Sequence, residues 1–402
     1  MAGREAPVVS RGSTLVTRRA RRFVLASPLF LVAWALAVLV ELPARTTVPL
    51  ALQGFVLTMV FGKAYALVPS YFDTTLAPPW APLLQFPLTV VGAPALAAAG
   101  LPGTPAWMGV AGATTWAAGT VVFVATIVYT IRGNPTGAAT GTSDVNAARH
   151  RIDRIANVGV PVVLAYLLAG SYTLIATHAT IPRFGIPAPG ATHLLAAGGG
   201  ALLVFAVGFR LFPRFLAAHP PRGLAPMVLA AGALAPIVIA TNLYGGRLFE
   251  VGAALQALAV LGWAGSYAVL FWRSDRSRVA LYGPLLGAVL GAIGVGLGLQ
   301  FAYAAVSTDL IVVHRRLNLV GFLGLTIVGA AYQFYPPAVG SFPLAGNRLA
   351  AGSMAAIFLG LLTQVGAAVG PASLSTVGEG LVVIGALAYA YLLVGLLAQR
   401  YG

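Results

Sequence analysis

Histidine is the residue type of this chain best suited to metal chemistry, because the sequence contains no cysteine and therefore no thiolate ligand. Among the five histidines, His193 and His314 stand inside long apolar stretches. An ionisable side chain is costly there unless it faces a partner, a cavity or a cofactor. Neutral imidazole is a common ligand of copper and of haem iron. We therefore predict His314 and His193 as candidate metal ligands, although each could equally be hydrogen-bonded at a helix interface.

Polar residues follow His314 directly. Arg315 and Arg316 come next, and Asn318 stands four residues after the histidine, on the same face of a helix. A guanidinium binds a carboxylate through two parallel hydrogen bonds, so this group suits a ligand such as a haem propionate. These four residues form the predicted cofactor-binding site. The alternative is that both arginines extend to the lipid headgroups.

The elements that position these residues are membrane-spanning helices. With 59% hydrophobic and only 8% charged residues, the chain lacks the charged surface of a soluble protein. Several apolar stretches exceed the roughly 20 residues that cross a bilayer as a helix, and the alternating pattern of a membrane β-barrel is absent. We predict an all-α, polytopic membrane protein whose main partner is the lipid bilayer.

Apolar runs bounded by proline, glycine and charge predict about twelve transmembrane helices. Residues 1–22 are predicted to be a basic cytoplasmic tail, residues 23–400 a single transmembrane domain, and residues 133–153 a flexible cytoplasmic linker. The predicted spans are 23–42, 47–71, 80–100, 105–131, 155–178, 190–213, 223–244, 248–272, 279–304, 309–336, 348–369 and 374–399.

Three of these spans share a sequence pattern, over residues 54–69, 198–213 and 321–336. In each, a glycine stands 15 residues before a proline, and an aromatic residue stands four residues before it. The pattern falls in the second, sixth and tenth spans. A recurrence every four spans disfavours the transporter plan whose halves repeat every six. The chain is therefore predicted to consist of three four-helix units, at about 23–131, 155–272 and 279–399.

Topology explains the formal net charge of +15 without nucleic-acid binding. Most arginines fall in alternate loops, on the side of the N-terminus. The other side receives only Arg45, Arg183, Arg247, Arg315 and Arg316. Because positively charged loops remain in the cytoplasm, we predict a multi-pass protein of the cell membrane with both termini cytoplasmic. The basic loops then face anionic lipid headgroups.

The other charged residues are assigned no chemistry. Glu379 stands near the outer end of its span and, with three other acidic residues, is predicted to form surface ion pairs with arginines. The alternative is that these acidic residues form the entrance for a cation. The only lysine, Lys63, is predicted to extend along its helix towards the headgroups. Neither a Walker motif nor an HExxH metal motif is present, so hydrolase and ATPase functions have no support.

The tenth span, in which Pro336 ends the sequence GAAYQFYP 22 residues after His314, resembles helix ten of haem–copper oxidase subunit I. The plan of twelve helices in three sets of four is similar to that family, and GFVLTMVFGKAYALVP is similar to its helix two. The resemblance implies metal ligands on helices two, six, seven and ten, near the outer side of the membrane. It also implies that His314 corresponds to the ligand of the low-spin haem.

The sequence departs from that family at most of the metal ligands. Val312 stands where the family has a second histidine on helix ten, and Thr46 or Thr47 stands where helix two has the partner ligand. His193 falls on the helix of a copper ligand but in another register. The adjacent histidine pair of helix seven, and the cross-linked tyrosine motif and acidic residue of helix six, are missing. The resemblance therefore implies a relative that binds one haem or one copper ion through His314, His193 or both, and that is not a terminal oxidase.

Two classes of function follow. One is a membrane protein with a single haem or copper site in electron-transfer or nitric-oxide physiology, acting with a redox partner or other membrane subunits. A looser resemblance to the twelve-helix haem/copper membrane proteins of the nitric-oxide response suits that class. The other is a small-solute or ion transporter or a cofactor-free membrane subunit, which the charge-poor, glycine-rich spans favour. The cofactor hypothesis requires His193 and His314 to lie near each other and away from lipid.

Overall fold

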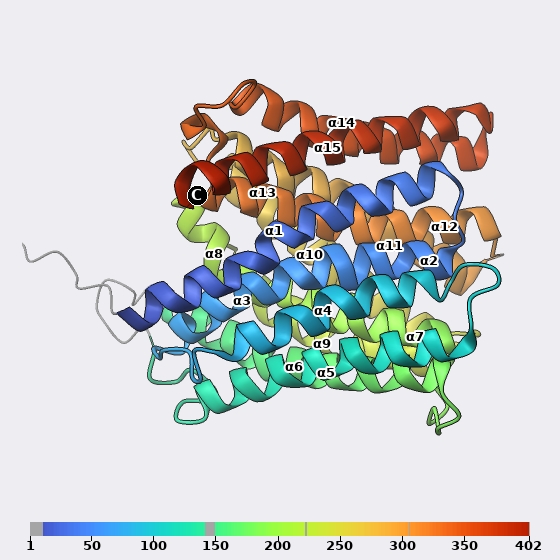
Figure 1. Cartoon of the computed structure of the whole chain (residues 1–402), viewed down its shortest axis with the longest axis horizontal. Helices are drawn as coiled ribbons and strands as arrows, with labels where there is room; N and C mark the ends of the chain where they lie inside the picture. The colour runs from blue at the N-terminus through green and yellow to red at the C-terminus, as the bar shows by residue number, and fades with distance from the viewer. Residues whose placement is uncertain (1–10, 141–148, 222, 305, 402) are drawn as a thin grey trace, which may run out of the picture.

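The computed structural model describes residues 11–140, 149–221, 223–304 and 306–401. Within these residues the secondary structure is helical, without a β-strand. Twelve helices in this part of the chain are long and apolar enough to cross a membrane, which confirms the predicted all-α polytopic membrane fold. They run side by side along the long axis of the molecule (Figure 1). We call the end of the bundle where the first helix begins and the last helix ends the terminal end, and the other the opposite end.

Most spans are continuous α-helices, whereas the second, sixth and tenth, called the divided spans below, are each one helix with a π-helical piece between two α-helical pieces. The continuous spans are α1 (Arg11–Leu39), α4 (Ala81–Ala98), α5 (Ala106–Ile131), α6 (His150–His178), α9 (Leu224–Thr241), α10 (Arg247–Trp272), α11 (Tyr282–Tyr303), α14 (Asn347–Val369) and α15 (Ser373–Tyr401). The divided spans are α2 (Ala44–Pro49), η1 (Leu50–Leu57) and α3 (Thr58–Tyr71); α7 (Ala188–His193), η3 (Leu194–Ala201) and α8 (Leu202–Leu216); and α12 (Thr308–Arg316), η5 (Leu317–Gly324) and α13 (Leu325–Phe334). Short 3₁₀ turns, η4 (Val279–Leu281) and η6 (Pro337–Val339), precede α11 and follow α13.

Two helices begin earlier than the apolar runs predicted. The helix α1 begins at Arg11 rather than at residue 23, because arginine is a good helix former and the basic segment continues the apolar helix. The helix α6 begins at His150, inside the predicted linker, and carries Asp153 in its first turn, where a carboxylate is favourable. Residues 141–148 of the predicted linker and residues 1–10 of the predicted tail lie outside the described residues.

The middle piece of each divided span is a π-helix, and the three π-helices have the same register. Each begins 19 residues and ends 12 residues before the repeated proline, which is Pro69, Pro213 or Pro336. The three π-helices contact one another. Their spans are also the most buried, with 78%, 72% and 78% of the apolar window inside the molecule against 33% to 56% in the others. Because π-helices are rare, their coincidence confirms the predicted repeat of the second, sixth and tenth spans.

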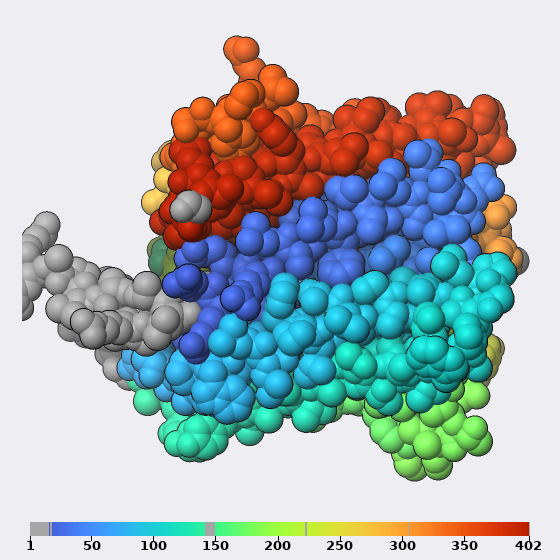
Figure 2. All heavy atoms as spheres, viewed as in Figure 1, coloured from blue at the N-terminus to red at the C-terminus, as the bar shows by residue number. Residues whose placement is uncertain are grey.

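The three four-helix units pack in equivalent ways. In each unit the first span packs on the second, and the third packs on the fourth. The fourth span of one unit then contacts the first span of the next, as α5 with α6, α10 with α11, and α15 with α1. Figure 2 shows the last of these seams, with α15 in red beside α1 in blue. The fold is thus a closed ring of three units around three central spans.

The repeated glycine allows each central span to approach the first span of its own unit. A Cβ atom on Gly54 would lie 2.7 Å from the ring of Phe30, and one on Gly321 would lie 2.9 Å from Leu290. Gly198 faces Tyr166 in the same way. The glycines of the sequence pattern therefore serve close packing inside each unit.

We expect Gly54→Ala to lower the free energy of unfolding by about 1–3 kcal/mol, because overpacking forces neighbouring side chains to shift. A matched control is Gly296→Ala on α11, where a Cβ meets no atom within 4 Å. The control is expected to be neutral or slightly stabilising, since alanine is the better helix former. Unfolding in detergent micelles, followed by tryptophan fluorescence, measures both changes. Equal effects of the two substitutions would contradict the packing role of Gly54.

Candidate functional site

His314 lies in α12, three residues before the first residue of the π-helix η5, and faces α11. Its Nδ1 donates a hydrogen bond to the carbonyl oxygen of Gly294 at 2.9 Å, and its ring contacts the edge of Phe301 at 5.5 Å between centroids. The imidazole also packs beside Gly298, one turn from Gly294 on α11, where a Cβ would make an ordinary van der Waals contact with Cε1 at 3.4 Å. Because a carbonyl oxygen only accepts, the proton is on Nδ1 and the lone pair is on Nε2.

His193 ends α7, directly before the π-helix η3, and has the same tautomer. Its Nδ1 donates to the carbonyl oxygen of Pro189 in the preceding turn at 3.2 Å, which leaves the lone pair on Nε2. Both histidines are partly buried, and they lie close enough for their charges to act on each other. The two predicted metal ligands therefore both lie at the opposite end of the bundle, each next to a π-helix.

Asn318 stays with His314, as the sequence predicts. Its amide nitrogen donates to the carbonyl oxygen of His314 at 2.7 Å and packs against Gly294. This hydrogen bond joins η5 to α12 across the junction at which the backbone changes from α to π geometry. Asn318 thus supports the position of the imidazole through the backbone.

Arg315 and Arg316 lie on the other side of α12. Successive residues of a helix are about 100° apart, so the histidine and the two arginines cannot share a face. The arginines line a cavity of about 260 Å³, which is bounded by the end of α1, by α2 and by α12. Val312 and Thr47 line the same cavity. The predicted four-residue cofactor site is therefore divided between two faces of α12.

Arg316 already has a carboxylate partner within the protein. Its Nη1 donates to Oε1 of Glu379 at 2.9 Å and to Oε1 of Gln364 at 2.7 Å. The predicted ion pair of Glu379 is confirmed, but its carboxylate is buried between helices rather than at the surface, with 6% of the residue exposed. Arg315 donates through Nε to the carbonyl oxygen of Ile311 at 3.3 Å.

The donors that are present suit a small metal site better than a haem held between two spans. Thr46, Thr47 and Val312, the positions that the resemblance aligns with further histidines, carry no nitrogen ligand, and Arg316 is paired with Glu379. The described residues contain no group of three or more His, Cys, Asp or Glu side chains that could hold a metal ion. The imidazoles of His314 and His193 stay candidate ligands.

A buried charge cluster at the terminal end was missed by the sequence reasoning, which placed its arginines among the loop charges. Asp153 of α6 accepts two hydrogen bonds from Arg214, at 2.7 and 3.2 Å, and lies 3.6 Å from Arg210. Arg210 also donates to the carbonyl oxygen of Tyr71 at 2.9 Å and to Oδ1 of Asn157. The cluster joins α3, α6 and α8. The spacing of Arg210 and Arg214, one helical turn apart at the end of an apolar run, was the available signal.

A central cavity of about 100 Å³ was also missed, and it is lined entirely by the three repeated spans. Counted from the repeated proline, each span contributes the same five positions, which are 10, 9, 6, 5 and 2 residues before it. These are Met59, Val60, Lys63, Ala64 and Leu67 in α3; Leu203, Val204, Val207, Gly208 and Leu211 in α8; and Thr326, Ile327, Ala330, Ala331 and Phe334 in α13. Phe212 completes the lining.

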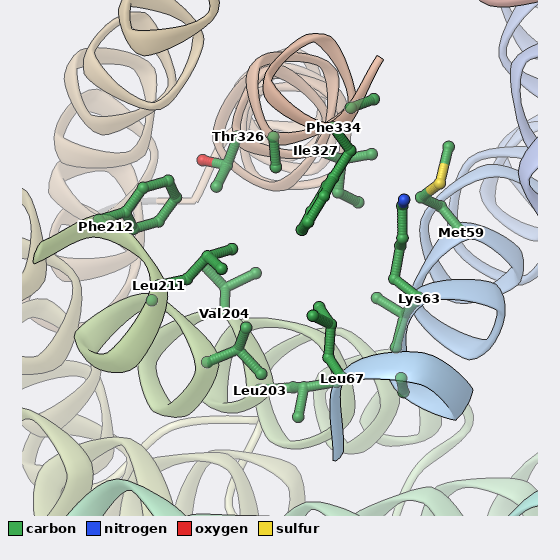
Figure 3. Close-up of a pocket in the computed structure, with 16 residues that line it drawn as sticks. Met59, Lys63, Leu67, Leu203, Val204, Leu211, Phe212, Thr326, Ile327 and Phe334 are labelled. Carbon is green, nitrogen blue, oxygen red and sulfur yellow. The ribbon is translucent and has the colours of Figure 1, made fainter. Parts of the chain in front are cut away.

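Lys63 is the one charged residue of this lining (Figure 3). Its Nζ donates to Oη of Tyr335 at 3.2 Å and lies 4.0 Å from the ring centroid of Phe334. The side chain therefore extends towards the terminal end, as predicted, but it ends beside aromatic rings at the cavity. Comparing the repeats could have identified the residue, because Val207 and Ala330 occupy the same position in the other two spans.

A scan against models of known protein families gives no match to this chain. No curated protein sequence matches it significantly either. The function is therefore argued from the geometry of these residues.

Proposed function

We propose that the chain is an integral membrane protein of haem–copper oxidase subunit I-like plan that binds one copper ion through Nε2 of His314 and Nε2 of His193. One observation carries the proposal. Both imidazoles donate Nδ1–H to a backbone carbonyl, and both keep the lone pair on Nε2. Metal-binding histidines almost always have such a hydrogen bond on the other ring nitrogen, because it sets the tautomer and the ring orientation.

Copper fits the two imidazoles better than the alternative, a single haem on His314. Among divalent first-row metals, copper binds nitrogen ligands most tightly. A haem would need partners for its propionates near the axial ligand, whereas Arg315 and Arg316 lie on the other face of α12 and Arg316 is paired with Glu379. A bound copper ion would supply one-electron chemistry. The described residues contain no group of three His, Cys, Asp or Glu side chains, so further positions on the ion would be open to water or a small molecule such as nitric oxide.

The surrounding residues hold and enclose the two imidazoles. The carbonyl oxygen of Gly294 keeps the proton of His314 on Nδ1, and the ring of Phe301 covers one edge of the imidazole. Asn318 holds the backbone where α12 passes into η5. This arrangement supports electron transfer or ligand binding, and it lacks the several ligands of a dioxygen-reducing centre.

The orientation of the site follows from the arginines. The terminal end carries most of them, so we place it in the cytoplasm and the histidine pair at the outer side of a cell membrane. A redox partner or another membrane subunit would then approach the histidine pair from the outer side.

Metal analysis of the purified protein tests the proposal. Protein produced with ample copper and haem is expected to contain one copper per chain and no Soret band. His314→Ala and His193→Ala are each expected to lose the copper, because each removes one of two ligands. The matched control is His178→Ala, which removes another histidine at the same end of the bundle and should retain it. Wild-type protein without copper, or copper that survives both substitutions, would refute the copper site; a Soret band lost with His314 would establish the haem alternative.

A small-solute transporter is the second candidate, and the central cavity favours it. Binding sites of many transporters lie between repeated units, where interrupted helices meet. Here the three repeated spans line the cavity together, although each of them is helical throughout. Uptake of a labelled ligand into proteoliposomes would distinguish transport from a cofactor-free structural subunit.

A further inference from the structure

The central cavity combines an apolar wall with one positive charge at its edge. Of its lining residues, only Lys63 and Thr326 carry a side-chain nitrogen or oxygen. The hydroxyl of Thr326 donates to the carbonyl oxygen of Phe322 at 2.7 Å, in its own helix. Figure 3 shows Thr326 and Lys63 on opposite sides of the cavity, with apolar side chains between them. Lys63 is therefore the single polar group available to an occupant.

The ammonium group of Lys63 has no carboxylate partner among the described residues, whose three salt bridges all belong to arginines. Its contacts are the phenol oxygen of Tyr335 and the faces of two aromatic rings, those of Phe334 and Tyr335. An ammonium has three donors, and the phenol oxygen accepts only one of them. Intramembrane lysines generally pair with a partner or mark a binding site. The missing partner is therefore an anion.

The repeat shows that packing does not require this lysine. The equivalent positions hold Val207 and Ala330, and these apolar side chains line the same cavity from α8 and α13. Of the three equivalent positions, only the one in α3 holds a charged residue. A functional contact explains that difference, whereas the filling of space does not.

Groups around Tyr335 extend the positive character towards the terminal end. Tyr335 lies close enough to Arg21 and Arg400 for their charges to act on it. Burial raises the pKa of Tyr335 to about 12, so its phenol stays protonated at neutral pH. Because the phenol oxygen accepts from Lys63, its own O–H remains free to donate. Tyr335 does not line the cavity, so it positions the ammonium of Lys63 from outside, and Lys63 remains the one polar group that an occupant would meet.

We propose that the central cavity binds a small organic monoanion, with its carboxylate on Lys63 and its apolar body between α3, α8 and α13. The cavity of about 100 Å³ is smaller than the cavity of about 150 Å³ that holds benzene, so an aromatic occupant requires flexible side chains such as Met59 to shift. An inorganic anion such as chloride is excluded by the apolar wall, which offers it no further donors. The site is separate from the histidine pair, and neither proposal depends on the other.

Calorimetric titration of the purified chain in lipid nanodiscs with sodium benzoate tests the site. Benzoate is expected to bind saturably, and Lys63→Met is expected to weaken it at least about tenfold, the usual loss for a charge-assisted hydrogen bond. Lys63→Arg keeps the charge and should retain most of the affinity. Benzamide, which has the same shape without the charge, should bind at least about tenfold more weakly to the wild type.

A second pair of variants tests the apolar part of the site independently of the charge. Leu203→Phe fills the cavity and should abolish benzoate binding. The control is Leu359→Phe on α14, which should not change binding, because Leu359 is 50% exposed and does not line the cavity. An unaltered elution profile in size-exclusion chromatography and an unaltered unfolding midpoint identify variants that remain folded. The proposal is overturned if benzoate does not bind to the wild type, if Lys63→Met or Leu203→Phe binds it as the wild type does, or if chloride displaces it at equal concentration.

Discussion

Replacing Asp153 by asparagine is expected to lower the free energy of unfolding by about 3–5 kcal/mol. The carboxylate of Asp153 is the only acidic partner that the described residues offer to Arg210, and the two residues are 4% and 5% exposed. Asparagine keeps the shape of the side chain and removes its charge. The guanidinium of Arg210 would then remain buried without a counter-charge, which is the costly outcome of breaking a buried ion pair.

The control for this prediction is Asp275→Asn, which removes the same charge from an exposed loop at the same end of the bundle. A change at such a site usually stays within about 0.5 kcal/mol. Both variants are unfolded by titration with sodium dodecyl sulfate from mixed micelles, followed by tryptophan fluorescence. If Asp153→Asn unfolds at the wild-type midpoint, the cluster that joins α3, α6 and α8 does not stabilise the fold.

Replacing Arg316 by methionine is expected to cost a similar amount, because it leaves the carboxylate of Glu379 buried without its ion-pair partner. The reverse change, Glu379→Gln, should cost less. The side chain of Arg316 is 20% exposed and borders a cavity of about 260 Å³, so its charge keeps access to water. Arg316→Met is therefore expected to lower the free energy of unfolding more than Glu379→Gln, because the charge it leaves without a partner is the more buried of the two.

Arg247→Met is the control for Arg316→Met, since Arg247 is exposed at the same end of the bundle. Copper content adds a second readout. If Arg316 is a structural partner of Glu379, the folded fraction of Arg316→Met should contain as much copper per chain as the wild type. If Arg316→Met instead loses its copper while keeping its stability, Arg316 belongs to the cofactor site that the sequence predicts.

The architecture of the chain could be predicted from the sequence because hydropathy and helix length determine which segments cross a bilayer. The repeat was visible because close packing requires a glycine at the same place in each unit, as at Gly54 against Phe30. The π-helices could not be predicted. Leu50, Leu194 and Leu317 suit an α-helix equally well, and the altered hydrogen bonding depends on how three spans meet at the centre.

The candidate site was only partly predictable, because the sequence gives neighbours along a helix but not the partners across it. His314 and Asn318 share a face as their spacing requires. The separation of His314 from Arg315 also follows from helix geometry, but the partner of Arg316 on α15 and the cavity beside Lys63 depend on spans far away in the chain. Contacts between residues of different units cannot be predicted from the sequence of a single segment.

Because the three units form a closed ring, a chain that begins at another unit could form the same contacts between units. The seam between α15 and α1 is equivalent to the covalently joined passage from α5 to α6. The ends also come together, since the guanidinium of Arg21 lies 3.1 Å from the ring centroid of Tyr401. A circular permutant that starts at His150, with Tyr401 joined to the beginning of α1 by a short linker, would retain every packing contact between the units. The packing between the three units therefore does not depend on which unit comes first in the sequence.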